Sequence, residues 1–128
     1  MSEPYKIALS ALVDEFRFEV LVRPEHFEEI QVVSNEVNRP GLALSGFFGC
    51  FEPERIQLIG NAENRYLRSL DAETSRKLIR DFVDARPVAI LITTGIEPDP
   101  TMIERAKEVG VPVLRTAVKT SPIMAALI

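Results

Sequence analysis

Five small or polar residues have types and positions that suit ligand binding: Arg39, Asn61, Thr93, Thr94 and Gly95. Each stands at the end of a predicted strand or beside the start of a predicted helix. Ligands of open parallel sheets bind where the strands end, and a helix N-terminus offers unpaired N–H groups to an anion. An arginine there can hold a phosphate or carboxylate through two parallel hydrogen bonds. These residues predict a pocket for an anion or a nucleotide.

The same residue types also suit ordinary turns and helix caps, which every strand-to-helix junction needs. The sequence leaves both interpretations open. One neighbouring pair favours a structural role. Arg55 and Glu63 flank one strand–turn–helix unit, and we expect them to pair across it. Gln57 lies between two apolar residues of a predicted strand, and we expect its side chain to face solvent or a partner domain.

We predict no catalytic residue and no metal site in these 128 residues. The chain has no G-x-x-x-x-G-K-[ST] phosphate-binding loop and no Gly-Lys dipeptide. The sole histidine, His26, stands among glutamates and favours a solvated loop, because a metal site needs several convergent ligands. Cys50 lies in an apolar segment and favours a buried, unreactive thiol. A small hydrolase or transferase acting alone would need a base, a nucleophile and an anion hole, which this chain does not offer.

The composition bounds the class of protein. A length of 128 residues with 46% hydrophobic content suits one domain, 1–128, with a core of ordinary size. A net charge of −4 and a pI near 5.1 argue against a nucleic-acid partner, which would require a basic face. No apolar run approaches the roughly 20 residues of a membrane helix. A lone cysteine and the lack of a signal peptide favour the cytoplasm.

Apolar periodicity predicts strands that alternate with helices. The predicted strands cover 18–22, 30–33, 55–59, 88–92 and 111–114. The predicted helices cover 9–17, 41–51, 62–70, 72–86 and 101–109, with another that begins at Ser121. Such alternation predicts an α/β fold with three layers, in which helices flank a mainly parallel sheet of about five strands.

Several residues mark the expected ends of these helices. Asn61, Asp71 and Thr101 are predicted N-caps, and Glu104 would complete a capping box with Thr101. Gly110 is the predicted C-terminal stop. The aromatic residues of the 41–51 helix favour the core over a docking patch; they are Phe47, Phe48 and Phe51. The six final residues are all apolar, so we expect the polypeptide to continue or this tail to pack on something.

The stretch from Asn38 to Leu67 reads NRPGLALSGFFGCFEPERIQLIGNAENRYL and resembles the N-terminal domain of HPr kinase/phosphorylase. The flanking segments ALVDEFRFEVLV, AILITTGIEPDPTMIERAKEVGVPVLRT and KTSPIMAALI extend the resemblance over essentially the whole chain. One departure is Arg65, where the family pattern leads us to expect a small residue. The resemblance implies a small α/β unit similar to the N-terminal domain of murein peptide ligases, with an accessory or regulatory role.

The resemblance places the family's chemistry elsewhere. The parent enzyme phosphorylates a serine of HPr with ATP and reverses the reaction by phosphorolysis, within carbon catabolite regulation by the phosphotransferase system. A C-terminal P-loop domain with ATP and Mg would then follow residue 128, and no catalytic residue of that domain matches a position here. The implied partners are this kinase domain, HPr through the parent enzyme, and further copies of the chain in a hexamer. The alternative is a free-standing module that senses a nucleotide or an anion.

Overall fold

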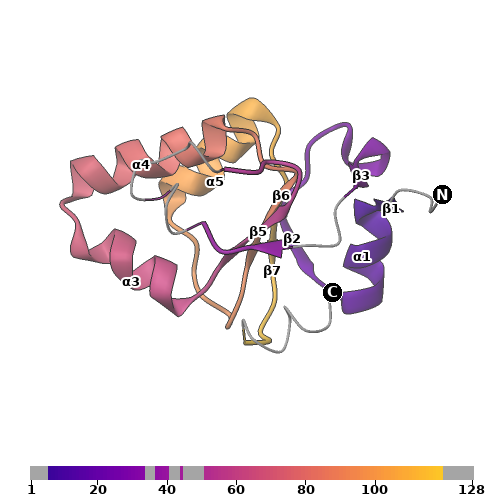
Figure 1. The fold of residues 1–128 in the computed structure, drawn as a ribbon, viewed down its shortest axis with the longest axis horizontal. Helices are drawn as coiled ribbons and strands as arrows, with labels where there is room; N and C mark the ends of the chain where they lie inside the picture. The colour runs from indigo at the N-terminus through magenta and orange to yellow at the C-terminus, as the bar shows by residue number, and fades with distance from the viewer. Residues whose placement is uncertain (1–5, 34–36, 41–43, 45–50, 120–128) are drawn as a thin grey trace.

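The computed structural model describes residues 6–33, 37–40, 44 and 51–119. The strands are β1 Ile7–Ala8, β2 Glu19–Val22, β3 Gln31–Val32, β4 Val37–Asn38, β5 Ile56–Ile59, β6 Ala89–Ile92 and β7 Val113–Arg115. The helices are α1 Leu9–Phe16, the 3-10 helix η1 Phe27–Glu29, α3 Asn61–Ser69, α4 Ala72–Asp84 and α5 Pro100–Val109. Figure 1 shows the sheet between α1 on one side and α3, α4 and α5 on the other.

The main sheet is mixed. Its five strands follow the order β2-β7-β6-β5-β4, in which β4 to β7 pair in parallel and β2 runs antiparallel to β7. The predicted strand at 30–33 is present as β3, but it pairs with β1 in a separate two-stranded sheet. The short edge strand β4 was not among the predicted strands. The predicted α/β class is confirmed, and the part of the chain that the structure describes forms two sheets.

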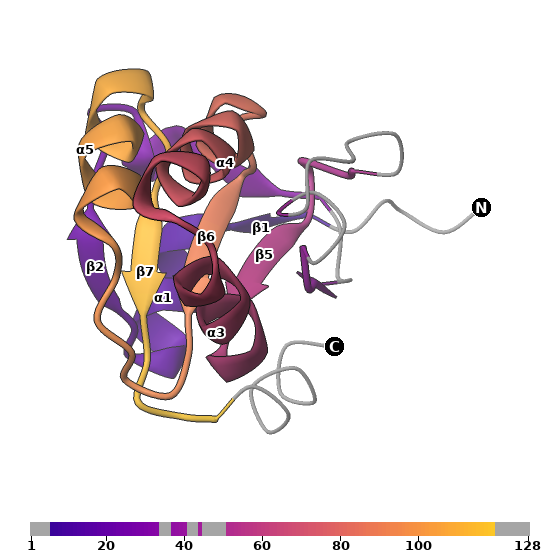
Figure 2. The same ribbon diagram turned by 90° about the vertical axis from the view of Figure 1, so that its left-hand side faces the viewer.

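Strand β6 explains why helices must cover both faces of the sheet. Its four residues are all buried, as an aliphatic run without alternation predicts. Ile90 and Ile92 belong to the core formed with α3, α4 and α5, whereas Ala89 and Leu91 belong to the core formed with α1. In Figure 2, α3, α4 and α5 lie in front of the sheet and α1 lies behind it.

Two helix ends agree with the prediction, and the start of α5 does not. Asp71 caps α4 by accepting the Thr74 N–H at 3.0 Å and the Thr74 hydroxyl at 2.6 Å, and these bonds lower the pKa of the Asp71 carboxyl. Gly110 ends α5 with a φ of 78°. The N-cap of α5, however, is Asp99, which accepts the Thr101 N–H at 2.8 Å. A proline follows Asp99 as the first helical residue and places Thr101 inside the helix.

Other predictions fall on parts of the chain that the structure does not describe. Most of the 41–51 helix, with Phe47, Phe48 and Cys50, lies outside the described residues, as does the helix from Ser121. Within that stretch Leu44 is helical and fully buried. The ring of Phe51 packs edge-on against Phe82 at 5.9 Å between centroids. Among the described residues, no helix has the length and apolar character needed to cross a membrane.

Candidate functional site

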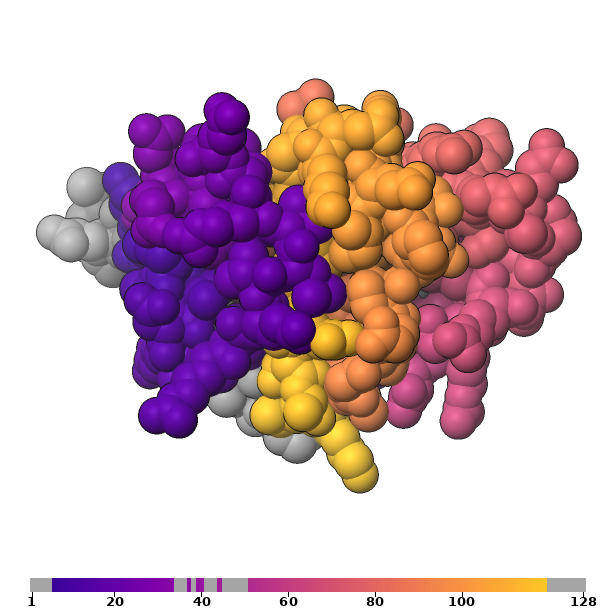
Figure 3. Space-filling view, turned by 180° about the vertical axis from the view of Figure 1, so that it is seen from behind, coloured from indigo at the N-terminus to yellow at the C-terminus, as the bar shows by residue number. Residues whose placement is uncertain are grey.

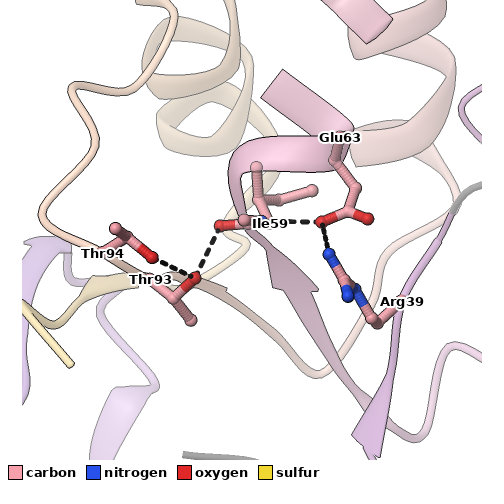
Figure 4. Close-up of polar contacts among 6 residues, drawn as sticks. Arg39, Ile59, Glu63, Thr93 and Thr94 are labelled. Atoms are coloured by element: carbon pink, nitrogen blue, oxygen red, sulfur yellow. Dashed lines mark hydrogen bonds and ion pairs between the residues drawn. The ribbon is translucent and has the colours of Figure 1, made fainter. Parts of the chain in front are cut away.

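The carboxyl ends of β4, β5 and β6 lie side by side and carry a set of polar contacts (Figure 4). In the sheet register Asn38 pairs with Gln57, and Ile59 pairs with Ile92. The residues that directly follow these strands therefore meet at one edge. The predicted residues Arg39, Thr93 and Thr94 share this edge. Parallel strand order explains the gathering, because carboxyl ends of parallel strands point the same way.

Glu63 occupies the place that an external anion would take at the start of α3. Its carboxylate is only 7% exposed, and its Oε1 atom accepts the Gly60 N–H at 2.7 Å. The same oxygen lies 3.1 Å from Nη2 of Arg39. A helix N-terminus favours negative charge near its unpaired N–H groups, and Glu63 supplies that charge from within the helix. Arg39 stays 40% exposed, so its guanidinium also faces solvent.

The prediction that Asn61 caps α3 is wrong. The helix begins at Asn61 itself, and Gly60 is the N-cap residue. The Asn61 side chain is exposed. Because Glu63 reaches back to the Gly60 N–H, the capping role falls to a residue three positions further along the chain.

Two threonines continue the polar set from β5 to the end of β6. The hydroxyl of Thr93, which is fully buried, lies 3.4 Å from the carbonyl oxygen of Ile59. The hydroxyl of Thr94 donates to that of Thr93 at 3.4 Å. The Thr93 N–H also donates to the Ile59 carbonyl at 3.0 Å. These bonds tie the end of β6 to β5.

Thr94 and Gly95 form a tight turn with their amides already engaged. Their φ angles are 62° and 64°, and the Ile96 N–H donates to the Thr93 carbonyl at 3.3 Å, a pattern typical of a type I′ turn. The Thr94 N–H donates to the Val118 carbonyl at 2.8 Å, and the Gly95 N–H to the Thr116 carbonyl at 2.9 Å. In this conformation neither amide is directed at a ligand.

Replacing Thr94 with asparagine should stabilise the domain by about 1 kcal/mol, because β-branched residues are strained at positive φ whereas Asn-Gly suits both positions of a type I′ turn. Urea unfolding measures the change. Thr94→Val keeps the branched shape and serves as the control, with an expected change within about 0.5 kcal/mol. A loss of stability in Thr94→Asn would contradict this account of the turn.

The predicted pairing of Arg55 with Glu63 is wrong. Arg55 instead contacts Glu52 at 2.5 Å, three residues away, while Glu63 pairs with Arg39. Because Arg39 directly follows β4, the pairing of β4 with β5 brings it to the start of α3. A carboxylate three positions after Gly60 was the available signal for the role of Glu63.

The expected exposure of Gln57 is also wrong, since this side chain is fully buried. Strand β5 lies between β4 and β6 and is covered on both faces. The Gln57 amide donates to the carbonyl oxygens of Glu52 at 3.0 Å and Arg55 at 2.9 Å. It therefore holds the turn that leads into β5, since a buried amide must find hydrogen-bond partners.

His26 is exposed and precedes the 3-10 helix η1, in agreement with the predicted solvated loop. Across the described ranges, no group of three or more His, Cys, Asp or Glu residues has the arrangement of a metal site.

The arrangement at the strand ends can bind an anion only if the ligand displaces Glu63 or reaches the exposed side of Arg39.

The family comparison decides the relationship. The sequence model for the HPr Serine kinase N terminus matches residues 7–128. This chain belongs to the HPr serine kinase N-terminal family. The chain is 34% identical over 118 residues to an HPr kinase/phosphorylase of Clostridium botulinum, covering 92% of this chain and 38% of the relative. It is 36% identical over 115 residues to the HPr kinase/phosphorylase of Clostridium beijerinckii, covering 90% of this chain and 37% of the relative.

A third relative and a solved structure extend the comparison. The HPr kinase/phosphorylase of Leptospira biflexa is 41% identical over 90 residues, covering 70% of this chain and 28% of the relative. The chain thus spans about two fifths or less of the length of these relatives. A crystal structure of the CBS and DRTGG domains of the regulatory region of Clostridium perfringens pyrophosphatase, complexed with the activator diadenosine tetraphosphate, is similar in fold. Its TM-score is 0.64 at 17% identity, covering 94% of this chain and 45% of that one.

Proposed function

We propose that this chain is a non-catalytic accessory or regulatory domain of a bifunctional HPr serine kinase/phosphorylase. The observation that carries the proposal is the family match over residues 7–128, together with relatives that are named for this enzyme. The parent enzyme would act in the cytoplasm. It would phosphorylate HPr on serine with ATP and Mg held in a P-loop domain C-terminal to residue 128, and would reverse the reaction by phosphorolysis.

The pairing of Glu63 with groups of the same chain favours a non-catalytic role for residues 1–128. At the strand ends the helix N-terminus and Arg39 are satisfied by a carboxylate of the same chain. Such a site positions no reacting group against a substrate, as a catalytic centre must. In this proposal the domain contacts its own kinase domain and further copies in a homo-oligomer, and it meets HPr only through the parent enzyme.

An assay of HPr phosphorylation tests this division of roles. The 128-residue chain, incubated with HPr and Mg-ATP, should give no phosphorylated HPr by mass spectrometry. The full-length enzyme of Clostridium botulinum serves as the positive control in the same buffer. Phosphorylation of HPr by the isolated chain, above that of a blank, would overturn the proposal.

A second candidate is a free-standing module that senses a nucleotide or an anion. The similar pyrophosphatase region favours it, because that region is regulatory and is complexed with a nucleotide activator. The pocket would involve Arg39, Asn61, Thr93, Thr94 and Gly95, and the expected likeness to murein peptide ligase N-terminal domains would suit such a role. A stop codon after Ile128 in the gene favours this candidate, whereas a downstream P-loop favours the first.

Amide NMR distinguishes a strand-end pocket from ordinary turns. Nucleotides or sugar phosphates at about 1 mM should shift the Gly95 amide if the pocket binds them. In Glu63→Gln the carboxylate no longer holds Arg39, so binding should tighten. Unchanged Gly95 signals in both proteins would end the idea of a ligand at the strand ends.

A further inference from the structure

A hollow lies away from the strand-end residues, where α3, α4 and the segment that leads into α5 meet. Its volume is about 560 Å³, and its lining includes Leu67, Arg68, Ser75, Arg76 and Ile79. Small-molecule sites commonly have volumes of this order. Figure 3 shows α5 in orange beside the pink and salmon residues of α3 and α4 on one face of the molecule.

Ser75 supplies the hollow with a hydroxyl group that has no partner among the described residues. The residue is only 8% exposed, yet no hydrogen bond to its hydroxyl exists within the described part of the chain. In the same part, every fully buried side-chain oxygen or nitrogen has a partner. The unpartnered hydroxyl must therefore retain access to the surface, and Ser75 lines the hollow. A hydroxyl that opens onto the hollow can donate to a ligand bound there or accept from it.

The acidic side chains that line the hollow already have partners within the described residues, whereas the arginine side chains do not. Glu97 contacts Arg115 at 3.0 Å, and Asp99 accepts the Thr101 N–H at 2.8 Å. Arg68 and Arg76 are exposed, and no carboxylate of the described residues lies within ion-pair distance of either. An incoming anion would therefore meet two available guanidinium groups, while the acids already have partners.

The wall beneath these arginines is apolar. Leu67 and Ile79 are buried and line the hollow together with the half-buried Leu70. An inorganic anion would leave this surface unused, whereas an organic body packed against it would gain hydrophobic stabilisation. The side chain of Asn64, which also lines the hollow, adds a hydrogen-bond donor and an acceptor.

We propose that this hollow binds a small organic anion whose phosphate contacts Arg68 and Arg76, whose body covers Leu67, Leu70 and Ile79, and which bonds the Ser75 hydroxyl. The site is separate from the strand-end residues and needs neither a kinase domain nor HPr. A negative result for this site would therefore not contradict the accessory role. A negative result for the accessory role would not contradict this site.

Amide NMR of the 128-residue chain with adenosine monophosphate tests the proposal. Saturable shifts are expected at Asn64, Ser75 and Thr101. Adenosine and inorganic phosphate serve as separate probes and should each bind at least about tenfold more weakly, because each lacks half of the contacts. If either matches the nucleotide, the stated ligand class is wrong.

Matched variants locate the binding. Arg76→Ala should weaken binding about tenfold, and Ser75→Ala about fivefold, through loss of their hydrogen bonds. Arg80→Ala is the control, because this exposed arginine lies on the same helix but does not line the hollow. The proposal is overturned if the nucleotide at about 10 mM moves none of the three amides, if the shifts centre on Gly95 instead, or if Arg80→Ala weakens binding as much as Arg76→Ala.

Discussion

Replacing Phe82 with alanine should lower the free energy of unfolding by about 3–5 kcal/mol, the largest loss that we expect from a single change in this domain. Phe82 lies on α4, is 0% exposed and stands in the core between the sheet and α3, α4 and α5. Its ring also packs edge-on against Phe51 at 5.9 Å. Truncation removes this apolar contact area and leaves a cavity that surrounding strands cannot fill without moving.

Equilibrium unfolding in urea, followed by circular dichroism, measures this loss. Phe82→Leu should cost less, because leucine retains most of the apolar volume. Arg80→Ala, exposed and two residues earlier on the same helix, should change stability by no more than about 0.5 kcal/mol. A loss below about 1 kcal/mol in Phe82→Ala would contradict the position of this ring in the core.

Replacing Glu63 with alanine should cost about 2–3 kcal/mol, because it removes the carboxylate that caps α3 and leaves the Gly60 N–H without its acceptor. Gly60 is buried, so water cannot readily replace the lost bond at 2.7 Å. The effect on Arg39 is smaller, since a guanidinium that is 40% exposed can be hydrated when its partner is lost.

Three variants separate the two interactions of Glu63. Glu63→Gln keeps an acceptor for the Gly60 N–H and should recover most of the stability lost in Glu63→Ala. Arg39→Ala removes only the ion pair and should cost no more than about 1 kcal/mol. If Arg39→Ala destabilised the domain as much as Glu63→Ala, the ion pair and not the cap would be the main contribution.

Local patterns predicted the elements whose causes are local. The run from Val88 to Ile92 indicated a strand covered on both faces, and β6 is such a strand. Asp71 and Gly110 were identified from the preferences of helix ends, which depend on the nearest few residues. Asn61 and Thr101 failed because two good capping residues compete at each junction. At α5, Asp99 stands directly before a proline, a combination that fixes the start of the helix.

Local sequence patterns could not predict the features that depend on contacts between residues far apart in the sequence. The antiparallel direction of β2 depends on its pairing with β7, and periodicity says nothing about strand direction. Gln57 looked exposed because glutamine usually is, but a central strand buried it and the turn before β5 supplied its partners. The partner of Glu63 depended on β4, a two-residue strand too short to predict.

The pairing of β2 with β7 has a consequence for how the chain assembles. Glu19 faces Arg115 across this pair, and the Arg115 guanidinium donates a hydrogen bond to the Glu19 carboxylate. The two residues are 96 positions apart in the sequence. Closing so long a loop is entropically costly, and native contacts that are far apart in sequence slow folding. A nascent polypeptide emerging from the ribosome can join β5 to β6 early, but β2 has no strand of the main sheet to pair with until β7 has been synthesised.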